Sequence, residues 1–260
     1  MEVYMKCNKV FFFDLDGTIY HGESPIQGAK ECIEYLQKHK ISFYFLTNNA
    51  MRTQKQIVKK LETMGFSNIQ EEQVFTSAMA AALYAKKKNR GNRVFCIGEE
   101  GLHMALLQQG FELVEAHADQ VVVGLDRSAD FTTYTKALHE LQQDACFIAT
   151  NPDRRVPQSQ GDLIGNGAVI QMLEYASERK AEIVGKPTAV MMEEALQYAG
   201  IQKEDCIVVG DNLETDVLFG LNNHVTTVFV TTGLHTKEDA VKRNIHPDWT
   251  ISNLKELWNI

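Results

Sequence analysis

Long hydrophobic runs are absent from this sequence. No stretch approaches the roughly 20 consecutive apolar residues that a membrane-spanning helix needs. The early apolar run Val10–Phe13 is too short for the core of a signal peptide, and Asp14 ends it. Internal repeats and low-complexity tracts are absent as well. We therefore expect a folded protein of the cytoplasm that has no membrane partner.

Cysteine pairs and an excess of basic charge are also absent. None of the cysteines forms a C-x-x-C pair, and three fall in expected strands, which predicts reduced core thiols rather than a disulfide framework or a zinc site. The five are Cys7, Cys32, Cys96, Cys146 and Cys206. The 34 acidic residues exceed the 26 basic ones, so the formal net charge is −8. A general nucleic-acid binder needs a basic surface, so we expect no nucleic-acid partner, whereas a small anionic substrate needs only a local positive site.

What the sequence does have is an apolar run that stops at two aspartates. The ten residues from Lys9 to Thr18 are K-V-F-F-F-D-L-D-G-T. The run predicts a buried strand, and ligands of α/β sheets bind at the carboxyl ends of strands, so we expect Asp14 at the rim of a sheet and Asp16 on the following turn. Two carboxylates this close favour a bound cation such as Mg²⁺, and an aspartate nucleophile with a metal is one route to phosphoryl transfer. An ordinary polar turn is the alternative interpretation of this stretch alone.

Strands are expected to alternate with helices along most of the 260 residues. Apolar stripes with helical spacing predict helices over 28–39, 53–64, 78–88, 102–109, 134–141, 167–177 and 188–200. Apolar runs predict strands over 10–13, 41–46, 74–75, 93–98, 121–126, 146–151, 206–209, 225–230 and 249–251. This alternation predicts an α/β fold with a doubly wound parallel sheet. Because the pattern restarts at Arg93, we expect a core of residues 1–79 and 183–260 with a second α/β domain, residues 80–182, inserted into it.

Polar residues also lie at or near the ends of other expected core strands, where they can form one site with Asp14 and Asp16. They are Thr47 with Asn48 and Asn49, Lys186, and Asp211 with Asp216. A transferring phosphoryl group needs a cation, a hydroxyl and backbone donors around its oxygens, and a metal needs further oxygen ligands. Each segment alone is compatible with a surface lysine or a polar turn. Together, and in this order, they indicate a phosphoryl-transfer site.

The four segments resemble the motifs of a known family. D-L-D-G-T, L-T-N-N, G-K-P and G-D-N-L-E-T-D are similar to the four motifs of the haloacid dehalogenase (HAD) superfamily. The long insertion between the second and third motifs is similar to the C2-type α/β cap of its class IIA branch, the NagD-like and p-nitrophenylphosphatase-like hydrolases. The resemblance covers nearly the whole chain. It implies a Rossmann-like core, an inserted cap and a phosphatase activity.

The resemblance also implies a role for each motif residue. Asp14 would be the nucleophile that forms an aspartyl-phosphate, and Asp16 the acid that protonates the leaving oxygen and then the base that activates water. Mg²⁺ would be held by Asp14, the backbone carbonyl of Asp16, and Asp211. The phosphoryl group would be held by Thr47, Lys186 and the backbone of Asn48 and Asn49. Asp216, with Gly17 and Thr18, would support this arrangement.

Substrate choice is expected to come from the inserted cap, because the four motifs hold only the phosphoryl group and the metal. The best candidates lie in the polar loop after the expected strand 146–151, at Asn151, Asp153 and Arg154. An ordinary turn, with residues chosen for backbone geometry, is the alternative for this loop. The substrate would be a small phosphorylated metabolite; phosphosugars, nucleotides and pyridoxal phosphate all stay open, as does a homodimer.

Two other functions use a similar set of residues. A receiver-type signalling domain also gathers acidic residues, a threonine and a lysine at strand ends, but it is a single small domain and its aspartates sit on different strands. The D-x-D pair on one turn disfavours it. A phosphotransferase or mutase would keep the same site and pass the phosphoryl group to a sugar.

Overall fold

The computed structural model describes residues 9–156 and 161–259. Within it the chain forms two compact units, the first made of Met1–Thr47, Lys55–Phe75 and Ala195–Ile260, and the second of Asn48–Gln54 and Thr76–Glu194. These limits differ from the expected boundaries at 79/80 and 182/183, which remain a prediction about the domains. The nine helices of the described residues are α1 (Ala29–Lys38), α2 (Gln54–Thr63), α3 (Ser77–Lys88), α4 (Glu100–Gln108), α5 (Phe131–Gln142), α6 (Asn166–Ser177), α7 (Ala189–Ala199), α8 (Leu218–Asn222) and α9 (Lys237–Arg243).

A six-stranded sheet with the order β15-β14-β13-β1-β4-β5 organises the first unit. Its strands are β1 (Val10–Phe13), β4 (Phe43–Thr47), β5 (Val74–Thr76), β13 (Cys206–Gly210), β14 (Thr226–Val230) and β15 (Trp249–Ile251). Strand β1 is central and runs parallel to both of its neighbours, β13 and β4. All four of its residues are buried, which is why it is a continuous apolar run rather than an alternating one. The chain leaves β1 toward β4 and returns on the other side at β13, so the carboxyl end of β1 is a topological switch point.

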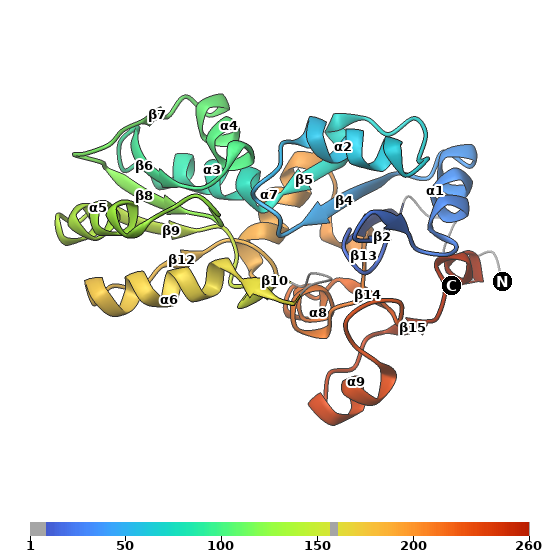
Figure 1. The fold of residues 1–260 in the computed structure, drawn as a ribbon. Coiled ribbons are helices and arrows are strands. Elements are labelled where there is room, and N and C mark those ends of the chain that lie inside the picture. Colours follow the sequence, from blue (N-terminus) through green and yellow to red (C-terminus); the bar gives the residue numbers. More distant parts are fainter. Residues whose placement is uncertain (1–8, 157–160, 260) are drawn as a thin grey trace. The chain divides into compact units, whose positions relative to one another are not determined.

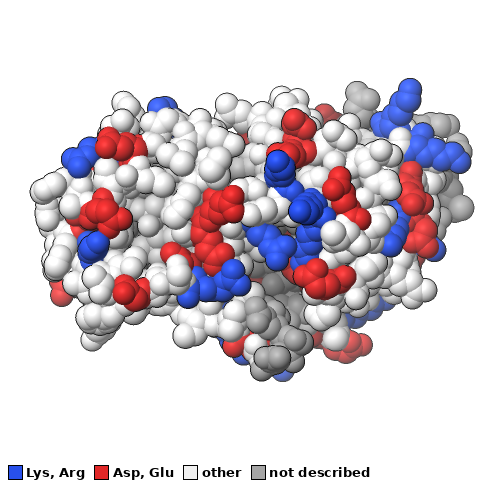
Figure 2. All heavy atoms as spheres, turned by 45° about the horizontal axis from the view of Figure 1, so that its top comes forward, with Lys and Arg blue, Asp and Glu red and all other residues white. Residues whose placement is uncertain are grey.

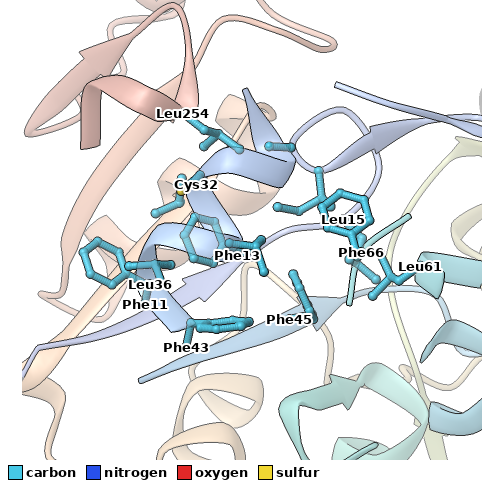
Figure 3. Packing of buried hydrophobic residues seen from close by; sticks show 14 of the residues in the cluster. Phe11, Phe13, Leu15, Cys32, Leu36, Phe43, Phe45, Leu61, Phe66 and Leu254 are labelled. Atoms are coloured by element: carbon cyan, nitrogen blue, oxygen red, sulfur yellow. The ribbon is translucent and has the colours of Figure 1, made fainter. Parts of the chain in front are cut away.

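One face of this sheet packs on the core shown in Figure 3. Phe11 and Phe13 of β1 point to this face and stack with ring centroids 5.8 Å apart, as residues two positions apart in a strand should. Buried residues of α1 and α2 cover them, among them Leu36 and Leu61, and Leu254 closes one end of the cluster. Truncation of the fully buried Phe13 to alanine would cost about 3–5 kcal/mol of stability. This packing holds β1, and with it the turn that follows, in one position.

A second, five-stranded sheet lies in the second unit, in the order β12-β9-β8-β6-β7. Its strands are β6 (Arg93–Ile97), β7 (Glu112–Leu113), β8 (Gln120–Val123), β9 (Cys146–Ala149) and β12 (Glu182–Ile183), and neighbouring strands are parallel. Helices α5 and α6 pack on one face, and α3 and α4 lie together on the other (Figure 1). The structure confirms the predicted α/β class with a parallel, doubly wound sheet. A separate sheet, also flanked by helices, is present as expected for a cap domain.

Several predicted element ends are wrong. Strand β8 ends at Val123 rather than at Asp126, because Asp126 instead accepts hydrogen bonds from the backbone and hydroxyl of Ser128 in a turn. Strand β9 ends at Ala149 and not at Asn151, and β4 starts at Phe43 rather than Ile41. Two short antiparallel hairpins, the two-residue strands β7 and β12, and the helices α8 and α9 were not predicted. The hairpins are β2 (Tyr20–His21) with β3 (Ser24–Pro25), and β10 (Arg155–Val156) with β11 (Leu163–Ile164).

Three predicted absences concern membrane-spanning helices, disulfide bonds and a nucleic-acid partner. Among the described residues, no helix is long and apolar enough to span a membrane. Cys32, Cys96, Cys146 and Cys206 are free thiols, as predicted, and Cys7 lies outside the described residues. On the face drawn in Figure 2, Lys and Arg side chains lie interspersed with Asp and Glu side chains. The absence of a nucleic-acid partner stays a prediction.

Candidate active site

Asp14 is the first residue after β1 and lies at the carboxyl end of the sheet. Its backbone N–H donates to the carbonyl of Val209 at 2.9 Å, so the ladder with β13 extends one residue past the strand. The side chain is half-buried, whereas the four residues before it are buried. The sequence prediction placed it here, and the apolar run that ends at this residue is the physical reason.

Asp211 leaves the neighbouring strand β13 at the same edge. Its side chain is buried, with 3% exposed, and both carboxylate oxygens accept hydrogen bonds. The hydroxyl of Thr18 donates to Oδ1 at 3.1 Å, and the backbone N–H of Leu234 donates to Oδ2 at 2.7 Å. Donors on both oxygens fix the direction of the carboxylate. Thr18 therefore helps to orient the carboxylate of Asp211, and its supporting role in a catalytic site remains a prediction.

Asp216 lies in a π-helical turn, Leu213–Val217, which β13 reaches through Asp211 and Asn212. Its side chain is 1% exposed and accepts a hydrogen bond from the backbone N–H of Asn212 at 3.1 Å. The π-helical turn brings this carboxylate back toward the strand end. A Cβ atom at Gly210 would lie 2.2 Å from the Cβ of Asp216, so only glycine allows this approach.

The three carboxylates form one cluster. Asp14, Asp211 and Asp216 each offer one oxygen, and these oxygens lie within 4.8 Å of one another. Like charges this close in a partly buried place repel, and a divalent cation removes that cost. An all-oxygen donor set suits a hard cation such as Mg²⁺, so the residues present fit the expected metal. Asp216 joins the cluster directly, although it was predicted only to support it. The predicted ligand at Asp16 is its backbone carbonyl, which this side-chain cluster does not test.

The turn after Asp14 places Asp16 beside Tyr20. The backbone N–H groups of Ile19 and Tyr20 donate to the carbonyl of Leu15 at 2.8 and 3.1 Å, and the N–H of Gly17 donates to the carbonyl of Tyr20 at 2.8 Å. The hydroxyl of Tyr20 donates to Oδ2 of Asp16 at 3.2 Å. Asp16 itself is exposed. The predicted proton donor thus stands on a tightly bonded turn and points away from the core.

Thr47 ends β4 on the other side of β1. Phe13 pairs with Phe45, so Asp14 and Thr47 leave two adjacent parallel strands at the same edge of the sheet. Thr47 is buried, with 4% exposed. This position agrees with the sequence prediction, and its contact with a phosphoryl group remains a prediction.

The other predicted phosphate-binding residues lie in the second unit. The side chain of Asn48 brackets the backbone of Lys186: its Oδ1 accepts from the Lys186 N–H at 2.8 Å, and its Nδ2 donates to the Lys186 carbonyl at 3.1 Å. Asn49 accepts a hydrogen bond from the Met51 N–H at 2.9 Å in a local turn. The structure therefore brings the second and third motifs together through Asn48. Their contacts with substrate remain a prediction.

The candidate specificity loop is tied to Asn48 by hydrogen bonds. Asn48 Nδ2 donates to Oδ2 of Asp153 at 3.2 Å, and Asn151 Nδ2 donates to the same oxygen at 2.7 Å. Asn151 also accepts from the hydroxyl of Thr150 at 2.8 Å and is buried, with 7% exposed. Arg154 is exposed. The three predicted residues thus differ: Asn151 and Asp153 shape the loop, and Arg154 is the one that extends from it.

The segment after β14 contributes residues that the sequence prediction missed. The hydroxyl of Thr232 donates to the carbonyl of Gly17 at 2.8 Å, and the backbone of Leu234 binds Asp211 as described above. His235 is buried, and its Nδ1 accepts a hydrogen bond from the Leu213 N–H at 3.2 Å. Burial lowers the pKa of His235, and the charge of Arg243 lowers this pKa further. T-T-G-L-H follows a predicted strand, so the same strand-end rule could have found this segment.

The chain matches known proteins over almost its full length. The family described as haloacid dehalogenase-like hydrolase matches residues 11–112, and the related HAD-hydrolase-like family matches residues 183–257. An acid sugar phosphatase of Staphylococcus aureus is 36% identical over 253 residues, 97% of each chain. The solved structure of a p-nitrophenyl phosphatase from Archaeoglobus fulgidus is 32% identical with a TM-score of 0.90, covering 96% of this chain and 98% of that one. NagD from Escherichia coli is 29% identical with a TM-score of 0.89, covering 95% and 97%.

Proposed function

The chain belongs to the haloacid dehalogenase-like hydrolases and is a phosphatase, and we propose that it hydrolyses small phosphorylated metabolites through a phosphorylated Asp14. The observation that carries the proposal is the cluster of Asp14 with Asp211 and Asp216 at the switch point of the sheet. Asp14 is its least buried member, and so the one best placed to meet a substrate.

Mg²⁺ is the metal we propose for this cluster. Asp14, Asp211 and the backbone carbonyl of Asp16 would hold it, with Asp216 beside them. When bound, the ion would neutralise the carboxylates and the phosphoryl oxygens, so that an anionic nucleophile can approach an anionic substrate. Thr18 and the Leu234 N–H would keep Asp211 oriented for it.

The proposed reaction has two steps that share Asp14 and Asp16. In the first, a carboxylate oxygen of Asp14 attacks phosphorus, the bond from phosphorus to the ester oxygen breaks, and Asp16 gives its proton to that oxygen. In the second, water attacks phosphorus, Asp16 takes a proton from the water, and the bond to Asp14 breaks to release phosphate. Thr47, Lys186 and the backbone of Asn48 and Asn49 would hold the phosphoryl oxygens throughout.

A phosphorylated sugar is the substrate class we favour. The support is the acid sugar phosphatase of Staphylococcus aureus, which is similar over 97% of this chain. Nucleotides and pyridoxal phosphate are the alternatives, and the loop with Asn151, Asp153 and Arg154 is the candidate that distinguishes them. We place the enzyme in the cytoplasm, where its free thiols stay reduced, and we leave a homodimer open.

The phosphatase assignment replaces the receiver-type interpretation, since a receiver accepts one phosphoryl group and stops. A phosphotransferase or mutase would use the same Asp14 and Asp16 but would deliver the phosphoryl group to a sugar hydroxyl. Release of inorganic phosphate in proportion to the alcohol released would separate hydrolysis from transfer, because transfer leaves the phosphoryl group on an organic acceptor.

Substitution of Asp14 tests the proposal. Asp14→Asn keeps the shape of the side chain but removes the attacking charge, so turnover of p-nitrophenyl phosphate should fall by about three powers of ten or more while the fold survives. Asp144→Asn, at a side chain that is 98% exposed, is the matched control and should keep full activity. Acid-quenched wild type should carry an acid-stable, base-labile phosphoryl group that Asp14→Asn lacks. Appreciable turnover by a well-folded Asp14→Asn enzyme would exclude the covalent route.

A further inference from the structure

Asp16 of the first motif and Tyr20, two residues past its end, differ in burial. Asp16 is exposed, and an exposed carboxylate ordinarily samples several rotamers. Tyr20 is 4% exposed and belongs to the main hydrophobic core, with Leu15 and Ile19 in the same cluster. Its hydroxyl donates to Oδ2 of Asp16 at 3.2 Å. The core thus fixes the position of the tyrosine, and the tyrosine gives the exposed carboxylate a fixed partner.

The backbone of the turn holds the pair in register. Asp16 and Tyr20 form an isolated β-bridge, and the Gly17 N–H donates to the Tyr20 carbonyl at 2.8 Å. The Tyr20 N–H in turn donates to the carbonyl of Leu15 at 3.1 Å. These bonds close the loop between the two residues, so the backbone keeps the phenol near the carboxylate.

A lysine lies over the ring of the same tyrosine. Lys60 of α2 places its Nζ 3.9 Å from the centroid of the Tyr20 ring, which is a cation–π contact. The Lys60 side chain is only 12% exposed, and its Nζ also lies 3.8 Å from the carboxylate of Glu23. A cation at the ring face draws electron density from the phenol and makes its O–H a stronger donor. Lys60 therefore strengthens the hydrogen bond that Tyr20 offers to Asp16.

We propose that Tyr20, polarised by Lys60, is the positioning residue for proton transfer by Asp16. The proposal rests on the proposed function, in which Asp16 serves the leaving oxygen. In this arrangement Tyr20 holds Oδ2 of Asp16 in place, and Oδ1 is the oxygen that exchanges the proton. That proton passes to the ester oxygen as its bond to phosphorus breaks, and Oδ1 later accepts a proton from the attacking water. Tyr20 keeps its own proton in both steps.

The proposal predicts an effect that depends on the leaving group. An alkoxide is a poor leaving group and needs the proton from Asp16, whereas p-nitrophenolate departs without one. Tyr20→Phe should therefore lower kcat/KM for alkyl phosphates about tenfold, a fraction of the full benefit of general acid catalysis. Its kcat/KM for p-nitrophenyl phosphate should stay within about twofold of wild type. This constant includes only the steps up to the first irreversible one, the departure of p-nitrophenolate, so the later attack of water does not affect it. Lys60→Met should show the same selectivity with a smaller loss.

The experiment measures kcat/KM of wild type and variants across aryl phosphates of graded leaving-group pKa and one alkyl phosphate. The control is Tyr44→Phe, which removes a hydroxyl from a half-buried tyrosine on β4 that packs against Phe12. A steeper dependence on leaving-group pKa in Tyr20→Phe, and none in Tyr44→Phe, supports the proposal. Equal losses for all substrates, with or without a lower melting temperature, would assign Tyr20 a packing role and overturn it, as would no loss at all. If Asp14→Asn retains wild-type turnover, the proposed function fails instead, which is a separate result.

Discussion

A Cβ atom at Gly17 would lie 2.3 Å from Oδ2 of Asp211. Gly17 also has a backbone φ of +89°, a region that residues with a side chain rarely adopt. The two residues are far apart in the chain and meet because β1 and β13 are neighbours in the sheet. The glycine of the first motif is therefore needed for the aspartate of the fourth motif to reach its place.

Gly17→Ala should disturb the carboxylate cluster. The added methyl group must displace Asp211, and a shift of about 1 Å at a catalytic group costs roughly a hundredfold in rate. We expect kcat/KM to fall by about this factor and the melting temperature to fall as well, since the strained φ costs about 1–3 kcal/mol. Gly22→Ala is the matched control, because Gly22 has a φ of +59° but no atom within 4 Å of its Cβ position. Equal activity losses in both variants would show that backbone strain alone, and not the approach to Asp211, is responsible.

Removal of the metal should abolish activity. EDTA should stop turnover, Mg²⁺ should restore it, and Ca²⁺ should restore it poorly because its larger and looser shell would misplace Asp14. Binding can be measured without turnover, since an ion that binds only the folded state raises the melting temperature. We expect Mg²⁺ to raise it in wild type and in Asp144→Asn, and to have little effect in Asp211→Asn. Full activity in EDTA would contradict a metal at this cluster.

The loop after β9 should influence which substrate is preferred. Arg154 is exposed, so Arg154→Ala should raise KM for phosphorylated metabolites by about tenfold, the size of one charge-assisted contact, and affect p-nitrophenyl phosphate less. Arg155→Ala is the matched control, because Arg155 lies in β10 and pairs with Asp162 at 3.1 Å. Unchanged ranking of a metabolite panel in Arg154→Ala would exclude this residue as a selector.

Asn151 and Asp153 should act on specificity through the shape of the loop. Asp153→Ala removes the acceptor shared by Asn48 and Asn151, and Asn151→Ala removes one of its donors. We expect both variants to change the ranking of phosphorylated metabolites, measured as kcat/KM, with smaller effects on aryl phosphates. A uniform loss across the panel would mean that these residues hold the Asn48–Lys186 contact rather than select the substrate.

Acid should destabilise the protein partly through His235. Burial lowers the pKa of this histidine in the folded state, so below its ordinary value of about 6.5 the unfolded chain binds more protons than the folded one. Stability is then lost as the pH falls below that value, and protonation of Nδ1 would also break the hydrogen bond from Leu213. The drop in melting temperature between pH 7.5 and 5.5 should be smaller in His235→Gln than in wild type. His246→Gln, at an exposed histidine, should keep the full drop; an equal drop in all three proteins would contradict this role.

Local pattern was enough to locate the ends of the central strands. Val10–Phe13 and Cys206–Gly210 are continuous apolar runs, because central strands of a parallel sheet are buried on both faces. Polar residues directly after such runs must lie at the carboxyl edge, so Asp14 and Asp211 could be placed from sequence alone. The same reasoning gave a wrong end for the strand predicted over 121–126. Leu125 and Asp126 continue the pattern of an apolar run followed by an aspartate, but they turn away from the sheet.

The hydrogen bonds between the individual side chains could not be predicted from local sequence patterns. Thr18 and Asp211 are 193 positions apart, and Asn48 and Lys186 are 138 apart, so neither hydrogen bond leaves a signal in the spacing of residues. Tyr20 follows the first motif and was not among the predicted site residues. Its role depends on the turn that folds it back on Asp16 and on Lys60 of another helix.

The sequence by itself determined the α/β class, the alternation of the main strands and helices, and the residues that follow the central strands, because burial and periodicity are properties of short segments. Only the tertiary structure decided which of these residues meet. It joined Asp216 to the carboxylates of Asp14 and Asp211 and left Arg154 exposed while tying Asn151 and Asp153 into a network. Side-chain distances depend on how strands pair and helices pack, and that information is spread over the whole chain rather than held in any one motif.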